Sequence, residues 1–340
     1  VFTVTSYMNL IGMRLDPDKD YRFIMYADHG IEAYSNGVMV SQRMIKENPK
    51  AVEAYKKLLS KFSSSKLSAP ARVELAGLLY LDKKYDEAGK LASEVIADGS
   101  ADAKTRTAAQ YRLGWCLAET GEQAKAAKIF VDLVSASPSD PLAASATFRA
   151  GVCFAAGGAS KDAQKWLSDV IEKYPADEVV PAARLKLGEV YAAGNEWAKS
   201  AETYKTFIEK HPADKALYMA LFGLGWAMEN QGNYDEARKQ YTDVSAKTNS
   251  PTAARAQFQI GECYFAQKQY ESAVKELLKV SIIYNYPEWS AKAHLEAGRA
   301  FESLNQPEMA KKQYTECINQ AKGSDVAKVA ATRLKALDKE

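Results

Sequence analysis

The chain has 340 residues, with 45 Lys and Arg against 43 Asp and Glu, so its net charge is only +2. A composition of 47% hydrophobic and 26% charged residues is typical of a globular protein and argues against intrinsic disorder. The near-neutral charge gives no reason to expect a nucleic acid partner. No run of about 20 apolar residues predicts a membrane-spanning helix.

Residues 1–49 differ in pattern from the rest of the chain. The runs 21–26 and 37–40 are rich in β-branched and aromatic residues and are bounded by turn-forming residues, which predicts short strands. The chain opens on Val1 without a basic region followed by an apolar one, so we expect any signal peptide to have been removed or never included. Residues 50–69 are predicted to form a leading helix, ending near Phe62, and a serine-rich connector.

Residues 70–322 contain seven copies of a repeat. Each copy has a glycine or alanine in an apolar setting, which we call the anchor, and successive anchors are 36 to 38 residues apart. The anchors are Ala76, Gly114, Gly151, Gly188, Gly225, Gly261 and Gly298. Counted from the anchor, position −5 is always alanine, −3 is large and apolar, +12 is small, and +16 is aromatic or leucine in all copies but the first. Several columns in one register indicate a repeat architecture.

The repeat predicts a helical hairpin. Its first columns have helical spacing, so the first half of each copy should be an amphipathic helix. Glycines that follow are expected to end these helices with a positive φ, at Gly121, Gly158, Gly194 and Gly232. A second helix then packs back, and a proline follows or closes most of them. The predicted fold is an all-α solenoid of helix-turn-helix hairpins, with residues 323–340 as a capping helix.

At these columns the chain resembles the tetratricopeptide repeat family. The best-matching copy runs from Leu224 to Ala237, with Met228 where the family usually has tyrosine. The copies exceed the typical 34 residues by about three. The added length makes them similar to the repeats of two bacterial envelope proteins, the assembly lipoprotein BamD and the periplasmic division protein CpoB. The resemblance implies a superhelical scaffold that binds proteins or peptides in the periplasm or envelope.

A second resemblance covers residues 20–55. The segments 26–34, 36–40 and 44–49 look like part of the substrate-binding proteins that serve importers of thiamine precursors and alkylsulfonates. That domain needs well over 200 residues, so residues 1–49 would be either a fragment of it or a chance similarity. The alternative function is therefore an importer substrate-binding protein, reduced to a remnant and fused to a repeat interaction module.

The sequence shows no set of residues suited to catalysis. The histidines His29, His211 and His294 are more than eighty residues apart, and no phosphate-binding glycine loop occurs. The four cysteines occupy small-residue slots, three of them at position +2, and are predicted to be free and poorly reactive. We therefore expect no enzyme activity, no metal and no cofactor.

Positions −2 and +1 of each first helix are predicted to face a concave groove that binds an extended peptide. They hold Arg112, Arg149 and Lys186 at −2, and Trp115, Glu189, Trp226, Glu262 and Arg299 at +1. A basic row beside exposed tryptophans would suit an acidic or aromatic-bearing peptide. In the other interpretation, Trp115 and Trp226 fill space between repeats and have no partner.

Overall fold

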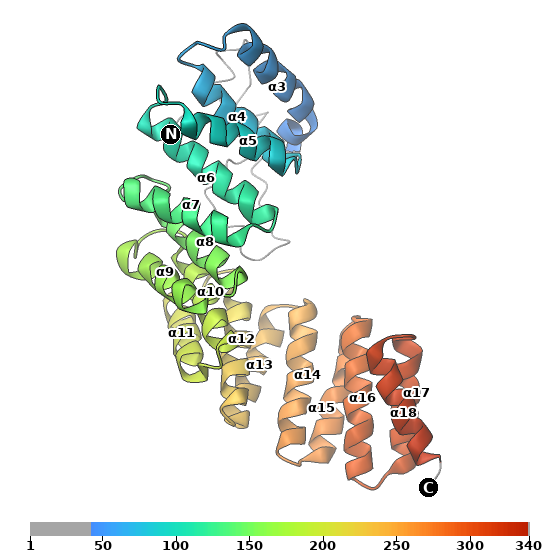
Figure 1. The fold of residues 1–340 in the computed structure, drawn as a ribbon. Helices are drawn as coiled ribbons and strands as arrows, with labels where there is room; N and C mark the ends of the chain where they lie inside the picture. The colour runs from blue at the N-terminus through green and yellow to red at the C-terminus, as the bar shows by residue number, and fades with distance from the viewer. Residues whose placement is uncertain (1–41, 339–340) are drawn as a thin grey trace. The chain divides into compact units, whose positions relative to one another are not determined.

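The computed structural model describes residues 42–338, and every regular element in that range is an α-helix (Figure 1). The helices are α3 (Gln42–Lys61), α4 (Ser68–Leu81), α5 (Tyr85–Ala97), α6 (Ala103–Glu119), α7 (Gln123–Ala136), α8 (Ala143–Ala156), α9 (Ser160–Lys173), α10 (Val180–Ala193), α11 (Trp197–Lys210), α12 (Leu217–Asn230), α13 (Tyr234–Lys247), α14 (Pro251–Ala266), α15 (Tyr270–Ile283), α16 (Pro287–Ser303), α17 (Pro307–Gln320) and α18 (Asp325–Leu337). None of these described helices combines the length and the apolar character needed to span a bilayer.

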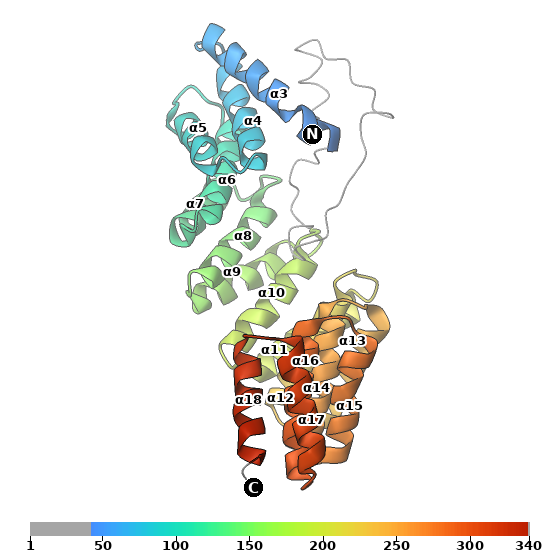
Figure 2. The same ribbon diagram turned by 90° about the vertical axis from the view of Figure 1, so that its right-hand side faces the viewer.

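The predicted all-α fold of helical hairpins is confirmed. Helices α4 to α17 form seven successive hairpins, α3 packs on α4, and α18 lies beside α16 and α17 (Figure 2). Helix α3 begins at Gln42 and contains Pro49, so it starts earlier than the sequence suggested. The strands expected at 21–26 and 37–40 lie outside the described residues.

The chain divides into two compact units. The N-terminal unit is Val1–Ala183 and the C-terminal unit is Arg184–Glu340. In the N-terminal unit the described helices α3 to α9 pack in chain order, and in the C-terminal unit α11 to α18 do the same. This sequential packing is the contact pattern of a repeat array.

At the anchor glycine a large side chain of the second helix packs directly against the backbone of the first helix. A Cβ atom added to Gly114 would lie 2.6 Å from the ring of Phe130, and one added to Gly151 would lie 2.7 Å from Leu167. In the C-terminal unit, a Cβ on Gly225 would lie 2.8 Å from the Tyr241 ring. The large residue at +16 therefore fills the space that the missing Cβ leaves. Both the −5 and the +12 columns are at most 1% exposed in all seven hairpins.

The first hairpin explains why its anchor is not glycine. Ala76 stands at the anchor and is fully buried, and position +16 is Ala92, which is fully buried as well. A small side chain at +16 leaves room for the Cβ of the anchor. The anchor and position +16 therefore form one packing contact, which accepts either glycine with a large side chain or alanine with alanine.

The turn inside each hairpin places one residue in the left-handed region. Gly121, Gly158 and Gly232 have φ values of 85°, 79° and 79°, as predicted. The prediction for Gly194 is wrong, because the residue with positive φ in that hairpin is Asn195, at 58°. The position is always +7 from the anchor, and three hairpins fill it with Lys83, Lys268 and Asn305. Gly194 is at +6 and lies still within the closing turn of the helix.

Replacing Lys268 with glycine should stabilise the protein. Its φ of 59° strains a residue that carries a Cβ, whereas glycine adopts this conformation without strain. We expect Lys268→Gly to raise the free energy of unfolding by about 0.5–1 kcal/mol, and Gly232→Ala to lower it by about 1 kcal/mol. Chemical denaturation measures both changes. A Lys268→Gly protein that is less stable than the parent would contradict this explanation of the turn.

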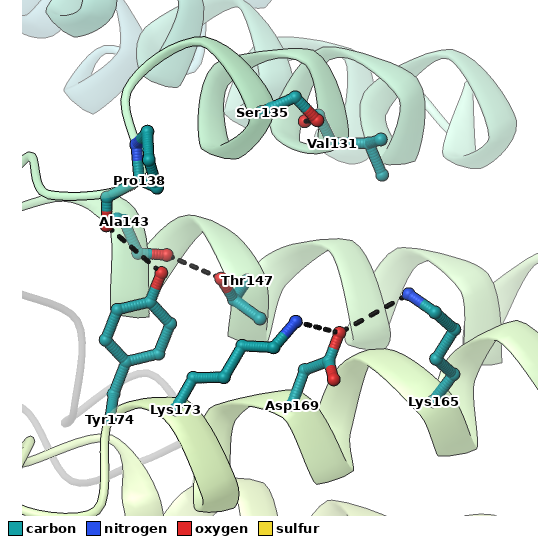
Figure 3. Close-up of polar contacts among 9 residues, drawn as sticks. All are labelled: Val131, Ser135, Pro138, Ala143, Thr147, Lys165, Asp169, Lys173 and Tyr174. Carbon is teal, nitrogen blue, oxygen red and sulfur yellow. Dashed lines mark hydrogen bonds and ion pairs between the residues drawn. The ribbon is translucent and has the colours of Figure 1, made fainter.

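Polar contacts also join consecutive hairpins at the carboxyl ends of their second helices. The hydroxyl of Tyr174, which follows α9, donates to the carbonyl oxygen of Pro138, which follows α7, over 3.3 Å (Figure 3). In the C-terminal unit, the hydroxyl of Tyr286 donates to the carbonyl oxygen of Asn249 over 3.1 Å. The two residues of each pair are one repeat period apart. Each such bond contributes about 1 kcal/mol and fixes the spacing of neighbouring hairpins.

Candidate functional site

The first helices of successive hairpins contact one another within each unit. Helix α4 contacts α6 in the N-terminal unit, and α14 contacts both α12 and α16 in the C-terminal unit. Positions −6, −2, +1, +4 and +5 recur at helical spacing, and we call the surface that they form the first-helix face. Of the eight predicted groove residues, the N-terminal unit holds Arg112, Trp115 and Arg149, and the C-terminal unit holds Lys186, Glu189, Trp226, Glu262 and Arg299.

In the N-terminal unit, the aromatic and basic residues stack on one another. The guanidinium carbon of Arg149, on α8, lies 3.5 Å from the ring centroid of Trp115, on α6. The ring of Tyr80, on α4, meets Trp115 edge-on with centroids 5.9 Å apart. The hydroxyl of Tyr80 donates to Glu119 over 3.0 Å. Burial and the Glu119 carboxylate beside it raise the pKa of Tyr80 well above its ordinary value, so this hydroxyl stays protonated.

The basic row of the N-terminal unit is less exposed than the sequence suggested. Arg149, predicted to face the groove, is only 8% exposed, and it lines a cavity beside Trp115. A cation stacked on an indole ring is buried by that stacking, which the −2 position alone does not reveal. Arg112 is half-buried, with its guanidinium against Gly77 of α4. Burial raises the pKa of the nearby Glu74, and the charge of Arg112 partly offsets this effect.

A cavity opens between α6 and α8 beside this stack. Its volume is about 220 Å³. The lining residues are Trp115, Ala118, Glu119, Gln123, Phe130, Arg149, Val152, Cys153 and Ala156. The wall is therefore mostly apolar, with the guanidinium of Arg149 as its cation and the exposed Glu119 as its carboxylate. Gln123 donates its side-chain amide to the backbone oxygen of Ala118 over 2.9 Å, which holds that side chain in place.

In the C-terminal unit, Lys186 and Glu189 form an ion pair with each other. Their charged atoms are 2.9 Å apart on α10, at positions −2 and +1. Both side chains are partly exposed, so the pair contributes little to stability. Glu189 also neutralises the positive charge that Lys186 was predicted to add to the basic row.

Trp226 takes part in an aromatic cluster around Arg255. The guanidinium carbon of Arg255, on α14, lies 4.5 Å from the ring centroid of Phe222, 5.3 Å from that of Trp226 and 5.8 Å from that of Trp289. Trp226 and Phe222 come from α12, and Trp289 comes from α16. All of these side chains are half-buried, so each keeps part of its surface open.

Glutamates gather on the first-helix face of α12, α14 and α16. Glu229 accepts hydrogen bonds from the hydroxyl of Tyr241 over 2.6 Å and from the side-chain amide of Gln259 over 3.0 Å. Glu296 pairs with Arg299 over 2.7 Å. The Oε1 atom of Glu262 is buried without a hydrogen-bond partner. Burial, reinforced by the charges of Glu296 and Glu229 and opposed by that of Arg299, raises the pKa of Glu262 to about 8.

Sequence reasoning missed several residues of these clusters. Arg255 stands at −6, Glu229 at +4, and Trp289 near the start of its helix, whereas the predicted groove comprises only positions −2 and +1. Positions −6 and −2 are four residues apart and therefore share a helix face. Extending the predicted face by one helical turn in both directions would have included Arg255 and Glu229.

All four cysteines are free and buried. Burial raises the pKa of the Cys116, Cys153 and Cys317 thiols to about 11, and the pKa of Cys263 is raised as well. Because the thiolate is the reactive form, we expect the native protein to react very slowly with a thiol reagent at neutral pH. After denaturation all four thiols should react at once. A bridge detected by mass spectrometry without reductant would contradict this prediction.

The other candidates for chemistry lie apart from one another. His211 packs against Phe207 with the rings tilted and their centroids 5.3 Å apart, and His294 forms a hydrogen bond of 2.8 Å with Gln313 inside the last hairpin. His29 lies outside the described residues. Within residues 42–338, no group of three His, Cys, Asp or Glu side chains is placed to hold a metal ion.

Comparisons with known proteins agree with this architecture. Models of the tetratricopeptide repeat match residues 108–140, 185–248, 222–288 and 291–322. A search of curated proteins found no match.

Solved structures show the same fold at low sequence identity. A tetratricopeptide repeat protein from Parabacteroides merdae aligns with 84% of this chain and 99% of its own, at a TM-score of 0.53 and 14% identity. The protein BtubC (BKLC) from P. vanneervenii aligns over 61% of this chain and 90% of its own, at a TM-score of 0.50 and 15% identity. The chain therefore contains tetratricopeptide repeats and has the fold that these repeats build.

Proposed function

We propose that this protein is a non-enzymatic scaffold that binds a partner protein, or an extended peptide segment of it, through the first-helix faces of its hairpins. One observation carries this proposal. In both units the first-helix face presents tryptophan and arginine side chains stacked on one another, with the tryptophans only half-buried. Tryptophan and arginine are the residues that most often anchor protein interfaces. The repeat fold supports the same function, because within each unit the first helices of successive hairpins form an extended surface for binding.

We further propose that the protein acts in the bacterial cell envelope, in assembly or maintenance. The support is the resemblance of its longer repeats to those of envelope proteins. Fractionation of cells producing the native gene product tests the location. Recovery of the protein in the cytoplasm would remove this part of the proposal and leave the binding function standing.

Binding is tested by selecting peptides of random sequence on the immobilised protein and measuring their affinity in solution. We expect Trp226→Ala to lower the affinity of the selected peptides that bind the C-terminal unit by about 30-fold or more, which is the effect of losing an interface anchor. Trp166→Ala is the matched control, since Trp166 is a half-buried tryptophan on the second helix α9. It should leave the affinity unchanged.

The stability of the same variants separates the two interpretations of Trp226. If Trp226 is a half-buried binding residue, its replacement by alanine should lower the free energy of unfolding by less than the roughly 3–5 kcal/mol that truncating a core tryptophan costs. Peptides that bind the Trp226→Ala protein as well as the parent, together with a large loss of stability, would assign Trp226 to packing.

A further inference from the structure

The helix junction that holds the cavity beside Trp115 has a counterpart in the C-terminal unit, where the same repeat positions meet. The junction of α6, α7 and α8 corresponds to the junction of α12, α13 and α14. Trp115 corresponds to Trp226 at +1, and Cys153 corresponds to Cys263 at +2. Each junction lies within a single unit, so the two can be compared position by position.

The two junctions differ at the positions that decide whether the space is filled. Position +4 is Ala118 in the first and Glu229 in the second, and position −2 of the following helix is Arg149 in the first and Gln259 in the second. In the C-terminal unit the chain itself places a carboxylate there, and Gln259 donates to that carboxylate over 3.0 Å.

The N-terminal junction lacks that side chain and has a hole instead. Ala118 ends at its Cβ, Phe130 replaces the hydrogen-bonding Tyr241, and a cavity of about 220 Å³ borders both residues. That volume equals about seven water molecules at about 30 Å³ each, which is room for the side chain of a glutamate. At the −2 position the amide of Gln259 is replaced by the guanidinium of Arg149, a stronger donor to a carboxylate.

We propose that this cavity binds the side chain of a glutamate from a partner protein, with its carboxylate against the guanidinium of Arg149. The methylene groups then lie along Trp115, Phe130 and Val152. The carboxylate of Glu119 at the cavity wall repels the incoming carboxylate, but Glu119 is exposed, so solvent screens this repulsion. The hydrogen bond from Tyr80 on α4 holds the Glu119 side chain in place. The site rests on the proposed function, since it names the side chain by which a partner would be anchored on the N-terminal unit.

The test uses a glutamate capped as N-acetyl-glutamate methylamide and the full chain labelled with ¹⁵N. The chain has five tryptophans, so its indole N–H signals are few, and Trp115→Phe identifies the signal of Trp115. We expect a saturable shift of that signal with a dissociation constant of about 1 mM, as a ligand of this size can reach. The uncharged N-acetyl-glutamine methylamide should bind at least about tenfold more weakly.

Two variants show whether the cavity is responsible. Ala118→Glu reproduces Glu229 and should fill the cavity with a tethered carboxylate, which abolishes the shift without loss of folding. Ala192→Glu is the matched control, because Ala192 is also at +4 but does not line the cavity; this variant should keep the parent's affinity. Arg149→Gln reproduces Gln259 and should remove the preference for glutamate over glutamine.

Any of three results would overturn the proposal. The first is the absence of a saturable shift up to about 20 mM probe, a concentration at which a site with a dissociation constant of about 1 mM would be nearly full. The others are equal affinity for the glutamine compound, and an Ala118→Glu protein that binds the probe as well as the parent does. Peptides selected on the parent distinguish this failure from failure of the proposed function. If selected peptides bind parent and Ala118→Glu equally, the scaffold function stands and the glutamate site falls.

Discussion

Replacing Phe130 with alanine is expected to lower the free energy of unfolding of the α6–α7 hairpin by about 3–5 kcal/mol, the cost of truncating a fully buried aromatic residue. Phe130 is 0% exposed and fills the space over Gly114. The effect should be local, because each hairpin contacts only its neighbours. Unfolding of such an array is not a single two-state step, so native-state hydrogen exchange of α6 and α7 is the suitable measurement.

A double-mutant cycle with Gly114 tests the physical basis of the repeat. Gly114→Ala alone should destabilise by about 1–3 kcal/mol, because the new Cβ would lie 2.6 Å from the Phe130 ring and this overlap outweighs the better helix propensity of alanine. In the Phe130→Ala background the overlap is gone. The same Gly114→Ala substitution should then be neutral or stabilising, as the natural pair of Ala76 and Ala92 suggests.

The control for this cycle is Gly99→Ala. A Cβ on Gly99 would meet nothing within 4 Å. Its effect should be the same in the parent and in the Phe130→Ala protein. Contributions from Gly114 and Phe130 that simply add, within about 0.5 kcal/mol, would show that the anchor column has some cause other than close packing.

The hairpin fold could be predicted because its packing contacts recur at fixed spacing. The contact between the anchor and position +16 recurs in all seven hairpins. A misleading residue in one copy can therefore be recognised by comparison with the other copies. The prediction for Gly194 failed for a related reason. The left-handed position is fixed at +7 by the geometry of the turn, whereas the glycine in that copy stands one residue earlier. Column position, and not residue type, was the better guide.

The candidate site was predicted less well because it depends on contacts that do not recur. Arg149 shares position −2 with Lys186, yet one stacks on Trp115 and the other pairs with Glu189. Each outcome depends on the neighbouring hairpin at one place only. The Arg255 cluster likewise needs aromatic residues from two other helices. The repeat in the sequence predicts contacts that occur in every hairpin, and it cannot predict a contact that occurs at one hairpin only.

Glu262 shows how such a combination affects stability. It occupies the same +1 position as Trp115 and Trp226, so an ordinary surface carboxylate would be the simplest expectation. The structure instead places it near Glu296 of α16 and Glu229 of α12, with Arg299 as the opposing positive charge. Arg299 is already paired with Glu296, which weakens its effect on Glu262. The neutral form of Glu262 is therefore favoured in the folded protein.

Substitution of Glu262 with glutamine should stabilise the protein at high pH. The pKa of Glu262 is about 8 in the folded chain against an ordinary 4.5, so the folded state binds the proton more tightly. The stability contributed by this proton is fully present below pH 4.5 and is lost as pH rises through 8. Because glutamine stays neutral, we expect Glu262→Gln to be similar to the parent at about pH 4 and more stable by about 2–4 kcal/mol at about pH 9.

The control for this prediction is Glu209→Gln, which changes an exposed glutamate on the second helix α11. Its stability should follow that of the parent across the whole pH range. Denaturation of both variants and the parent at several pH values gives the comparison, with hydrogen exchange in α14 reporting on the local effect. A Glu262→Gln protein whose stability differs from the parent by the same amount at acid and alkaline pH would mean that Glu262 is ionised in the folded state. Its carboxylate would then be solvated on the first-helix face and available as a surface charge.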